Sequence, residues 1–207
     1  GHSTIDFGFT SACQIWRVEL MRLEETNAAR DATRTGTAEG IAWAERSLET
    51  NAADSRMSVE GETLKAVERI CQKCERDGAP HKFTLPDGAL HALLVDTSTL
   101  FDGADLYDYV HIALGTNYVT EPAARRYWLD KPITGVFDAS TNLRGAAELR
   151  ARVHFLGFVC EECHDAGEFA QVCTLVPNWD LLPSCDAVDR ARETWPLRSG
   201  ASNRVND

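Results

Sequence analysis

Apolar residues before residue 80 recur every three or four positions, which is the spacing of one face of a helix. The clearest series are Cys13, Trp16, Leu20 and Leu23, and then Leu64, Val67, Cys71 and Cys74. A weaker series occupies 41–48. We therefore expect 1–56 to form a helical extension, followed by a helix that stops at Gly78 and Pro80.

From His81 onward the apolar residues gather in short runs, which are typical of strands. The stretches 82–85 and 90–96 flank Pro86-Asp87-Gly88, whose residues favour a turn, so together they predict a hairpin. The run 153–159 is apolar on both faces, which favours a central strand. Further strands are expected at 109–114, 133–137 and 169–176.

Two more helices are expected in the second half. Thr141 can cap one that runs to about 152, and Ser184 or Asp186 can cap one that runs to 194. The predicted fold class is α/β, in the α+β sense: a central mixed β-sheet flanked by helices, with a helical N-terminal extension. The expected divisions are the extension at 1–56, the core domain at 57–198 and a disordered tail at 199–207.

The composition narrows the class of protein. The 207 residues are 43% hydrophobic, which suffices for one sizeable core. The chain contains no run of eighteen apolar residues, so no membrane span is expected. Asp and Glu number 32 against 21 Lys and Arg, giving a net charge of −11. This charge repels polyanions and disfavours a general nucleic-acid partner, while a protein partner stays open. Seven cysteines in a chain of this length are expected to be reduced thiols in the cytoplasm.

The densest group of metal-ligating residues follows the run 153–159. Cys160, Cys163 and His164 form a C-x-x-C-H motif, and Cys173 lies downstream. Three thiolates and one imidazole would suit a structural Zn²⁺ ion. The same motif is the spacing of covalent haem attachment. In the third interpretation, the cysteines are reduced residues in a turn after the strand and His164 is exposed.

The other C-x-x-C pair has a different setting. Cys71 and Cys74 lie on the apolar face of a predicted helix, at its C-terminal end. A redox-active pair needs the helix N-terminus, where the helix dipole lowers the thiol pKa. We therefore expect core cysteines, with a split four-cysteine zinc site shared with Cys160 and Cys163 as the alternative.

Two residues in predicted strands are candidates for catalysis. Asp96 ends the run 90–96, where it is either a metal ligand or a residue entering a turn with Thr97 and Ser98. His111 is the ionisable group within the predicted strand 109–114, so it is either a general base or a histidine that is hydrogen-bonded in the core.

From residue 58 the predicted order is helix, strand, strand, strand, helix, strand, which resembles the restriction-endonuclease-like, or PD-(D/E)XK, superfamily over roughly 58–160. The resemblance implies Asp96 as a ligand of a catalytic Mg²⁺ ion, with Glu62 or another acid of the first helix as an additional carboxylate, for cleavage of phosphodiesters. The third predicted strand departs from the family pattern because it has no Glu-x-Lys. Some members of the superfamily bind an iron–sulfur cluster through one upstream cysteine, a downstream C-x-x-C pair and one further cysteine. Cys71 or Cys74, together with Cys160, Cys163 and Cys173, matches this arrangement.

The local concentration of positive charge lies between 125 and 152. Arg125, Arg126 and Arg144 are the candidates for binding phosphate, and the neighbouring Tyr127 and Trp128 could stack on bases. The alternative is a solvated helix face, on which Glu148 pairs with Arg144 or Arg152.

No phosphate-binding glycine loop, nucleophile elbow, H-E-x-x-H motif or dinucleotide fingerprint occurs in the chain. Three hypotheses follow. The first is a degenerate nuclease-like domain that uses a divalent metal. The second is a non-enzymatic protein-interaction module with a structural zinc site. The third is a haem-binding protein.

Overall fold

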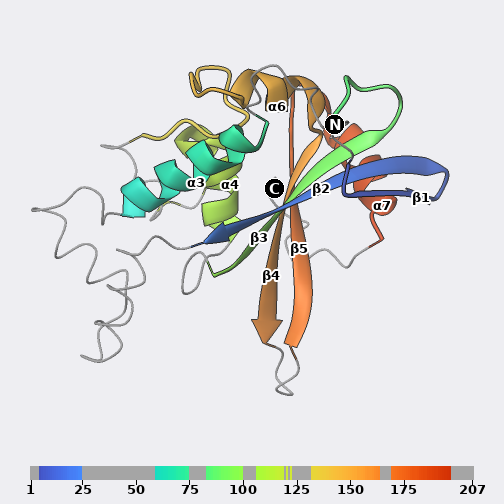
Figure 1. Cartoon of the computed structure of the whole chain (residues 1–207), viewed down its shortest axis with the longest axis horizontal. Helices are drawn as coiled ribbons and strands as arrows, with labels where there is room; N and C mark the ends of the chain where they lie inside the picture. The colour runs from blue at the N-terminus through green and yellow to red at the C-terminus, as the bar shows by residue number, and fades with distance from the viewer. Residues whose placement is uncertain are drawn as a thin grey trace, which may run out of the picture.

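The computed structural model describes residues 5–24, 59–74, 83–99, 106–118, 120, 122, 132–163 and 169–196. These residues form a five-stranded mixed sheet in the order β1-β2-β3-β4-β5 (Figure 1). The strands are β1 (Phe7–Ser11), β2 (Gln14–Glu24), β3 (Leu90–Thr99), β4 (Phe155–Cys163) and β5 (Phe169–Pro177). The predicted central mixed sheet is therefore confirmed.

The three middle strands are parallel, and the two outer strands run antiparallel to their neighbours. A two-residue turn joins β1 to β2. Both turn residues, Ala12 and Cys13, have positive φ angles, of 46° and 67°. Turns of this kind match the right-handed twist of a hairpin. The parallel strands are joined through helices, as parallel neighbours require.

In the described part of the chain, four helices cover the two faces of the sheet. α3 (Val59–Lys73), α4 (Leu106–Leu114) and α6 (Ala146–Arg152) pack on one face, here named the three-helix face, and α7 (Cys185–Glu193) packs on the other, the α7 face. Both crossovers, β2 to β3 and β3 to β4, move across the sheet in one direction. Right-handed crossovers therefore place their helices on the same face.

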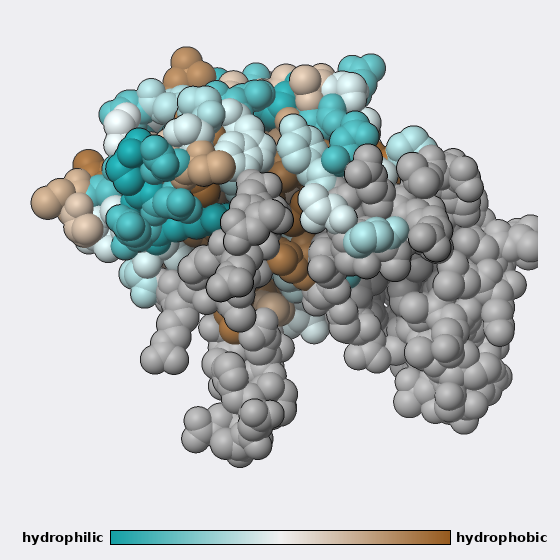
Figure 2. Space-filling model, turned by 180° about the vertical axis from the view of Figure 1, so that it is seen from behind, coloured by the Kyte–Doolittle hydropathy of each residue, from teal (hydrophilic) through white to brown (hydrophobic). Residues whose placement is uncertain are grey.

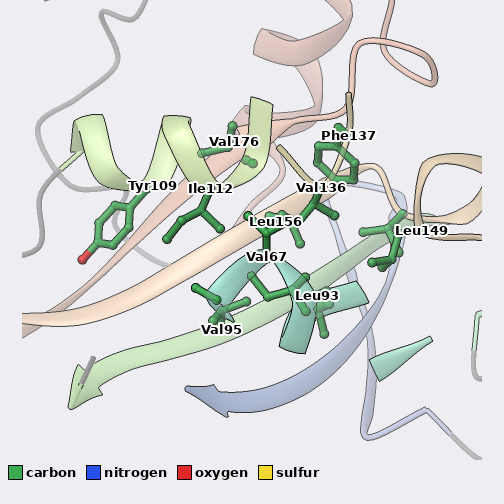
Figure 3. Close-up of a cluster of buried hydrophobic side chains, with 14 of the residues drawn as sticks. Val67, Leu93, Val95, Tyr109, Ile112, Val136, Phe137, Leu149, Leu156 and Val176 are labelled. Atoms are coloured by element: carbon green, nitrogen blue, oxygen red, sulfur yellow. The ribbon is translucent and has the colours of Figure 1, made fainter. Parts of the chain in front are cut away.

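Each face has its own hydrophobic cluster. Between the sheet and the three helices, Val67, Leu93, Ile112, Leu149 and Leu156 converge (Figure 3). On the α7 face the cluster is aromatic and includes Trp16, Phe155 and Trp195. Seen from behind, apolar residues are visible in a central band with hydrophilic residues beside and above it (Figure 2). Because the middle strands are covered on both sides, they carry apolar residues at successive positions.

The predicted helix at the start of the chain is wrong for the described residues 5–24, which form β1 and β2. Trp16 is fully buried on the α7 face and Leu23 is fully buried on the other, whereas Leu20 is 41% exposed. The supposed helical stripe thus combined residues from opposite faces of one strand. β2 pairs with β3, so 7–24 belong to the core sheet and not to a separate extension. The rest of the predicted extension and the tail lie outside the described residues.

Several other elements were predicted correctly. α3, α7, β4 and β5 lie where the sequence indicated, and Ser184 caps α7 by accepting from the Ala187 N–H group. The predicted helix up to 152 is present but starts later, at Ala146, and Gly145 occupies its N-cap position. The hydroxyl of Thr141 instead donates to the carbonyl of Gly135.

Three predicted strands are absent from the described residues. Residues 83–85 form no strand, and β3 has parallel neighbours on both sides, so the hairpin is wrong. Residues 109–114 are the larger part of α4, because an apolar run without clear periodicity fits a buried helix equally well. Residues 133–137 are irregular and bond to the end of α4: the Val136 and Phe137 N–H groups donate to the Ile112 and Ala113 carbonyls.

These corrections change the order of elements. From α3 onward the described order is helix, strand, helix, helix, strand, strand, helix, with the short 3₁₀ helix η2 (Thr116–Tyr118) after α4. The element order that carried the resemblance to the restriction-endonuclease-like superfamily is therefore not the order of this fold. In the described part of the chain, no helix is both long and apolar enough to cross a bilayer.

Candidate functional site

Asp96 lies near the carboxyl end of β3, in the parallel part of the sheet where open α/β folds bind ligands. Its Oδ2 atom accepts from Arg22 Nε at 2.8 Å, and its Oδ1 atom accepts from the N–H and hydroxyl of Ser98 at 3.0 and 2.6 Å. Burial alone would raise the pKa of Asp96, but the bonds from Ser98 and Arg22 outweigh it and lower the pKa. Both carboxylate oxygens are thus already bonded.

The predicted second carboxylate is not placed beside Asp96. Leu93 and Val95 face the three helices and Leu94 faces α7, so the alternation along β3 puts Asp96 on the α7 face. Glu62 belongs to α3, which covers the opposite face, and its side chain lies outside the described residues. The two proposed metal ligands therefore come from different sides of the sheet.

His111 is buried in α4 and not in a strand. Its Nε2 atom lies 2.8 Å from the Thr116 hydroxyl, which also accepts from the Ile133 N–H group at 2.8 Å. Burial lowers the pKa of His111 to about 4, so the ring is neutral near pH 7. This arrangement fits the interpretation of a histidine held in the core better than that of a general base.

The cysteines of the predicted metal site lie on both sides of the sheet. β4 continues through Cys163, so Cys160 and Cys163 lie within the strand and not in a turn after it. Cys160 packs against the three-helix cluster, whereas Cys173 is buried in the α7 cluster. One tetrahedral ion cannot bind both thiols across a sheet. The Cys163 and His164 side chains lie outside the described residues.

The other C-x-x-C pair, Cys71 and Cys74, lies in the core as the sequence predicted. Cys71 is fully buried and Cys74 packs against the same cluster. Burial raises the pKa of both Cys71 and Cys173 to about 12, which is the direction expected of thiols in apolar surroundings. Within the described ranges, no group of three or more His, Cys, Asp or Glu side chains is placed to hold a metal ion.

Of the three predicted phosphate-binding arginines, Arg144 lies within the described residues. Arg125 and Arg126 lie outside the described residues, and Arg144 is exposed in the turn before α6. Arg152 donates to Glu148 at 2.8 Å, four residues earlier on the same helix. This pair is one of the two that the alternative interpretation expected, but the Arg152 side chain is only 18% exposed and also donates to the Phe83 carbonyl, so it is not fully solvated.

A buried polar row that the sequence analysis missed crosses the amino ends of the parallel strands. The register aligns Arg17 with His91 on the neighbouring strand. His91 N–H donates to His154 Nδ1 at 3.1 Å, and Asn178 N–H donates to the His154 carbonyl at 2.8 Å. Asn178 also donates to the carbonyls of Arg150 and Val153, both at 2.8 Å. The row joins four segments of the chain at one level.

The bonds of this row fix the protonation of its two histidines. His91 Nδ1 lies 2.7 Å from the Arg152 carbonyl, so it carries the proton, and His154 Nδ1 accepts, so the proton of that ring is on Nε2. Burial, together with the neighbouring His91, lowers the pKa of His154 to about 4. The row therefore consists of neutral rings whose Nδ1 atoms are both hydrogen-bonded. A signal was present in the sequence, since each of these histidines interrupts an apolar run.

The outer edge of β1 is the second feature that sequence reasoning missed. Ser11 and Gln14 close a two-residue hairpin, so this pair is hydrogen-bonded, and such pairs alternate along the ladder. The Phe7 and Phe9 backbones therefore bond to β2, and the N–H and C=O groups of Gly8 and Thr10 point away from it. β1 is the end strand of the sheet in the part of the chain that the structure describes.

Edge strands are usually protected by lysine, proline or inward-pointing charge. β1 reads Phe-Gly-Phe-Thr-Ser and has none of these features. Phe9 packs on Trp16 and Trp195, with ring centroids 6.3 and 5.9 Å apart, whereas Phe7 is 54% exposed. The edge thus combines outward-pointing backbone groups with an exposed aromatic ring.

Comparisons of the chain with protein-family models, with curated proteins and with solved structures found no match. Its function must therefore be inferred from its own geometry.

Proposed function

We propose that this protein is a non-enzymatic interaction module whose β1 edge takes up an extended segment of a partner protein. The observation that supports this most directly is the uncharged edge strand, with the backbone groups of Gly8 and Thr10 directed outward. A partner strand can add its main-chain hydrogen bonds to such an edge, and its alternate side chains then provide specificity.

The other two hypotheses have less support from the described residues. A metal-dependent nuclease would need the Asp96 oxygens for an ion, and Arg22 and Ser98 occupy them. A zinc site built from both Cys160 and Cys173 would need them on one side of the sheet. The proposed module therefore does not include that zinc site.

The charge of the chain indicates the kind of partner. With a net charge of −11, the protein attracts positively charged chains at long range and repels acidic ones. Complementary charge speeds encounter and discriminates between partners more than it adds affinity. We expect the bound segment to be extended, to pair through its backbone with β1, and to come from a basic region of its own protein.

The experiment replaces Thr10 with proline. The substitution removes an N–H group that points outward and fills its place with the proline ring, while the bonds between β1 and β2 are kept. The matched control, Thr10→Val, keeps the N–H group and a β-branched side chain. Peptides selected from a random displayed library on the full chain serve as probes, and fluorescence polarisation gives their Kd.

We expect Thr10→Pro to raise the Kd of these peptides by about tenfold or more, because the complex loses at least one hydrogen bond and the strand geometry. Thr10→Val should bind them as the original chain does. Urea unfolding of both variants checks that the sheet is intact. The proposal is wrong if selection yields no peptide, or if the selected peptides bind Thr10→Pro unchanged.

A further inference from the structure

Gly8 leaves an open position in the middle of the β1 edge. A Cβ atom at Gly8 would meet one described atom within 4 Å, the carbonyl oxygen of Trp16 at 3.8 Å, which is ordinary contact. Both neighbours, Phe7 and Phe9, point toward the α7 face because side chains alternate along a strand. Among the described residues, no β1 side chain therefore covers the three-helix face between Asp6 and Thr10.

The aliphatic stem of Arg17 borders this position, whereas its guanidinium group extends toward β3, where one of its nitrogens also lies 3.4 Å from His91 Nε2. Arg17 lies directly opposite Gly8 on β2, and pairs at this position share one face of the sheet. Its two terminal nitrogens donate to the two oxygens of Asp87 at 3.1 and 2.9 Å, and one of them also donates to the Thr84 hydroxyl at 2.8 Å. The Arg17 side chain is still 32% exposed. Ile15, opposite Thr10, is 51% exposed on the same face.

A strand added to β1 would place one side chain over this position. Because the outward hydrogen bonds come from Gly8 and Thr10, the residue paired with Gly8 points to the three-helix face. A small residue there would leave Gly8 and the flank of Arg17 uncovered. A flat aromatic ring would cover the glycine and pack against the stem of Arg17, in the way that an aromatic residue compensates for an edge glycine across a strand pair.

We infer that Gly8 and Arg17 form a specificity slot for an aromatic side chain of the bound segment. This inference rests on the proposed function of the β1 edge. The residues beside the aromatic one pair with Phe7 and Phe9 on the α7 face, where β-branched apolar side chains fit. The partner segment is thus an aromatic residue between two apolar residues, within a basic stretch.

A second copy of this chain does not fit the slot. If two β1 strands paired through their outward groups, Gly8 would meet Thr10 or Gly8 of the other copy. The phenylalanines of that copy would point to the other face, since Phe7 and Phe9 alternate with Gly8 and Thr10. Two copies, each with a net charge of −11, also repel one another.

The test uses Gly8→Val in the full chain. Valine keeps the outward N–H and C=O groups and favours a strand, but its side chain fills the slot. Library peptides are selected on the original chain, and their binding to Gly8→Val and Thr10→Pro is measured in parallel. Each peptide is also made with its aromatic residue replaced by alanine.

We expect selected peptides to share an aromatic residue and to bind Gly8→Val about tenfold more weakly. Their alanine forms should bind both proteins equally. If the peptides depend on Thr10 but not on Gly8, the slot is refuted and the proposed function stands. If no selected peptide depends on Thr10, both are refuted. A dimer in sedimentation velocity that Thr10→Pro dissociates would overturn the assignment of a foreign segment as the occupant.

Discussion

Acidification from about pH 7 to about pH 5 is expected to destabilise this protein through histidines that are buried in neutral form, above all His111 and His154, whose pKa values are lowered furthest. His111 is 1% exposed and His154 is 7% exposed. The pKa of each is lowered from 6.5 to about 4, for His111 by burial and for His154 by burial and the neighbouring His91. In the unfolded chain both rings are in water and take up a proton near their ordinary pKa.

The sign of the effect follows from which state binds the proton. Above the unfolded pKa of 6.5 both states are neutral, so the stability is complete. Below it the unfolded chain is protonated, whereas the folded chain stays neutral until about pH 4. Each of these histidines then lowers the free energy of unfolding by about 1.4 kcal/mol per pH unit, or by about 2 kcal/mol at pH 5. Together, His111 and His154 lower it by about 4 kcal/mol, which is a large share of the ordinary stability of a domain.

The measurement is urea unfolding followed by tryptophan fluorescence at both pH values, for the original chain and for His111→Gln. Glutamine can bond to Thr116 but does not titrate, so the variant should lose about 2 kcal/mol less on acidification. The pKa values of Asp87 and Asp96 are lowered below their ordinary range, so these carboxylates titrate below this window. Equal losses in the two proteins would refute the assignment to His111.

Three further substitutions test the packing, the helix cap and the surface pair. Gly135→Ala should lower the free energy of unfolding, measured by thermal denaturation, by about 3 kcal/mol or more, because the new Cβ would clash with the backbone nitrogen of Gly115. Gly8→Ala, where space is open, is its control, and equal losses would contradict the close contact. Ser184→Ala should cost about 1 kcal/mol by loss of the α7 cap, whereas Ser184→Asp should keep it; equal urea midpoints would disprove the cap. Asp96→Ala removes an exposed ion pair with Arg22 and should lower the free energy of unfolding by less than about 1 kcal/mol. A loss above about 2 kcal/mol would contradict the view that this pair contributes little to stability.

Local patterns in the sequence sufficed for those elements whose surroundings match their own periodicity. α7 has a serine cap and one apolar side, and the strand at 153–159 is apolar on both faces, so neighbouring residues alone indicated each element. The mixed sheet flanked by helices followed from these elements. β2 was mistaken for a helix because both of its faces are partly buried, so its apolar residues do not alternate strictly. The prediction of a strand at 109–114 was wrong for the converse reason, because a fully buried helix has no polar side that would reveal its periodicity.

The candidate sites depend on pairing between distant segments, which no local pattern contains. The alignment of Arg17 with His91, and of His91 with His154, follows from strand order and register. Register also decides that Cys160 and Cys173 lie on opposite faces, and that Gly8 and Thr10 direct their backbone groups away from β2. A shift of one residue would exchange the two faces of a strand. The sequence by itself determined the chemistry of these side chains and several of the elements that carry them. Only the tertiary structure decided which of them meet, because long-range strand pairing sets both neighbour and face.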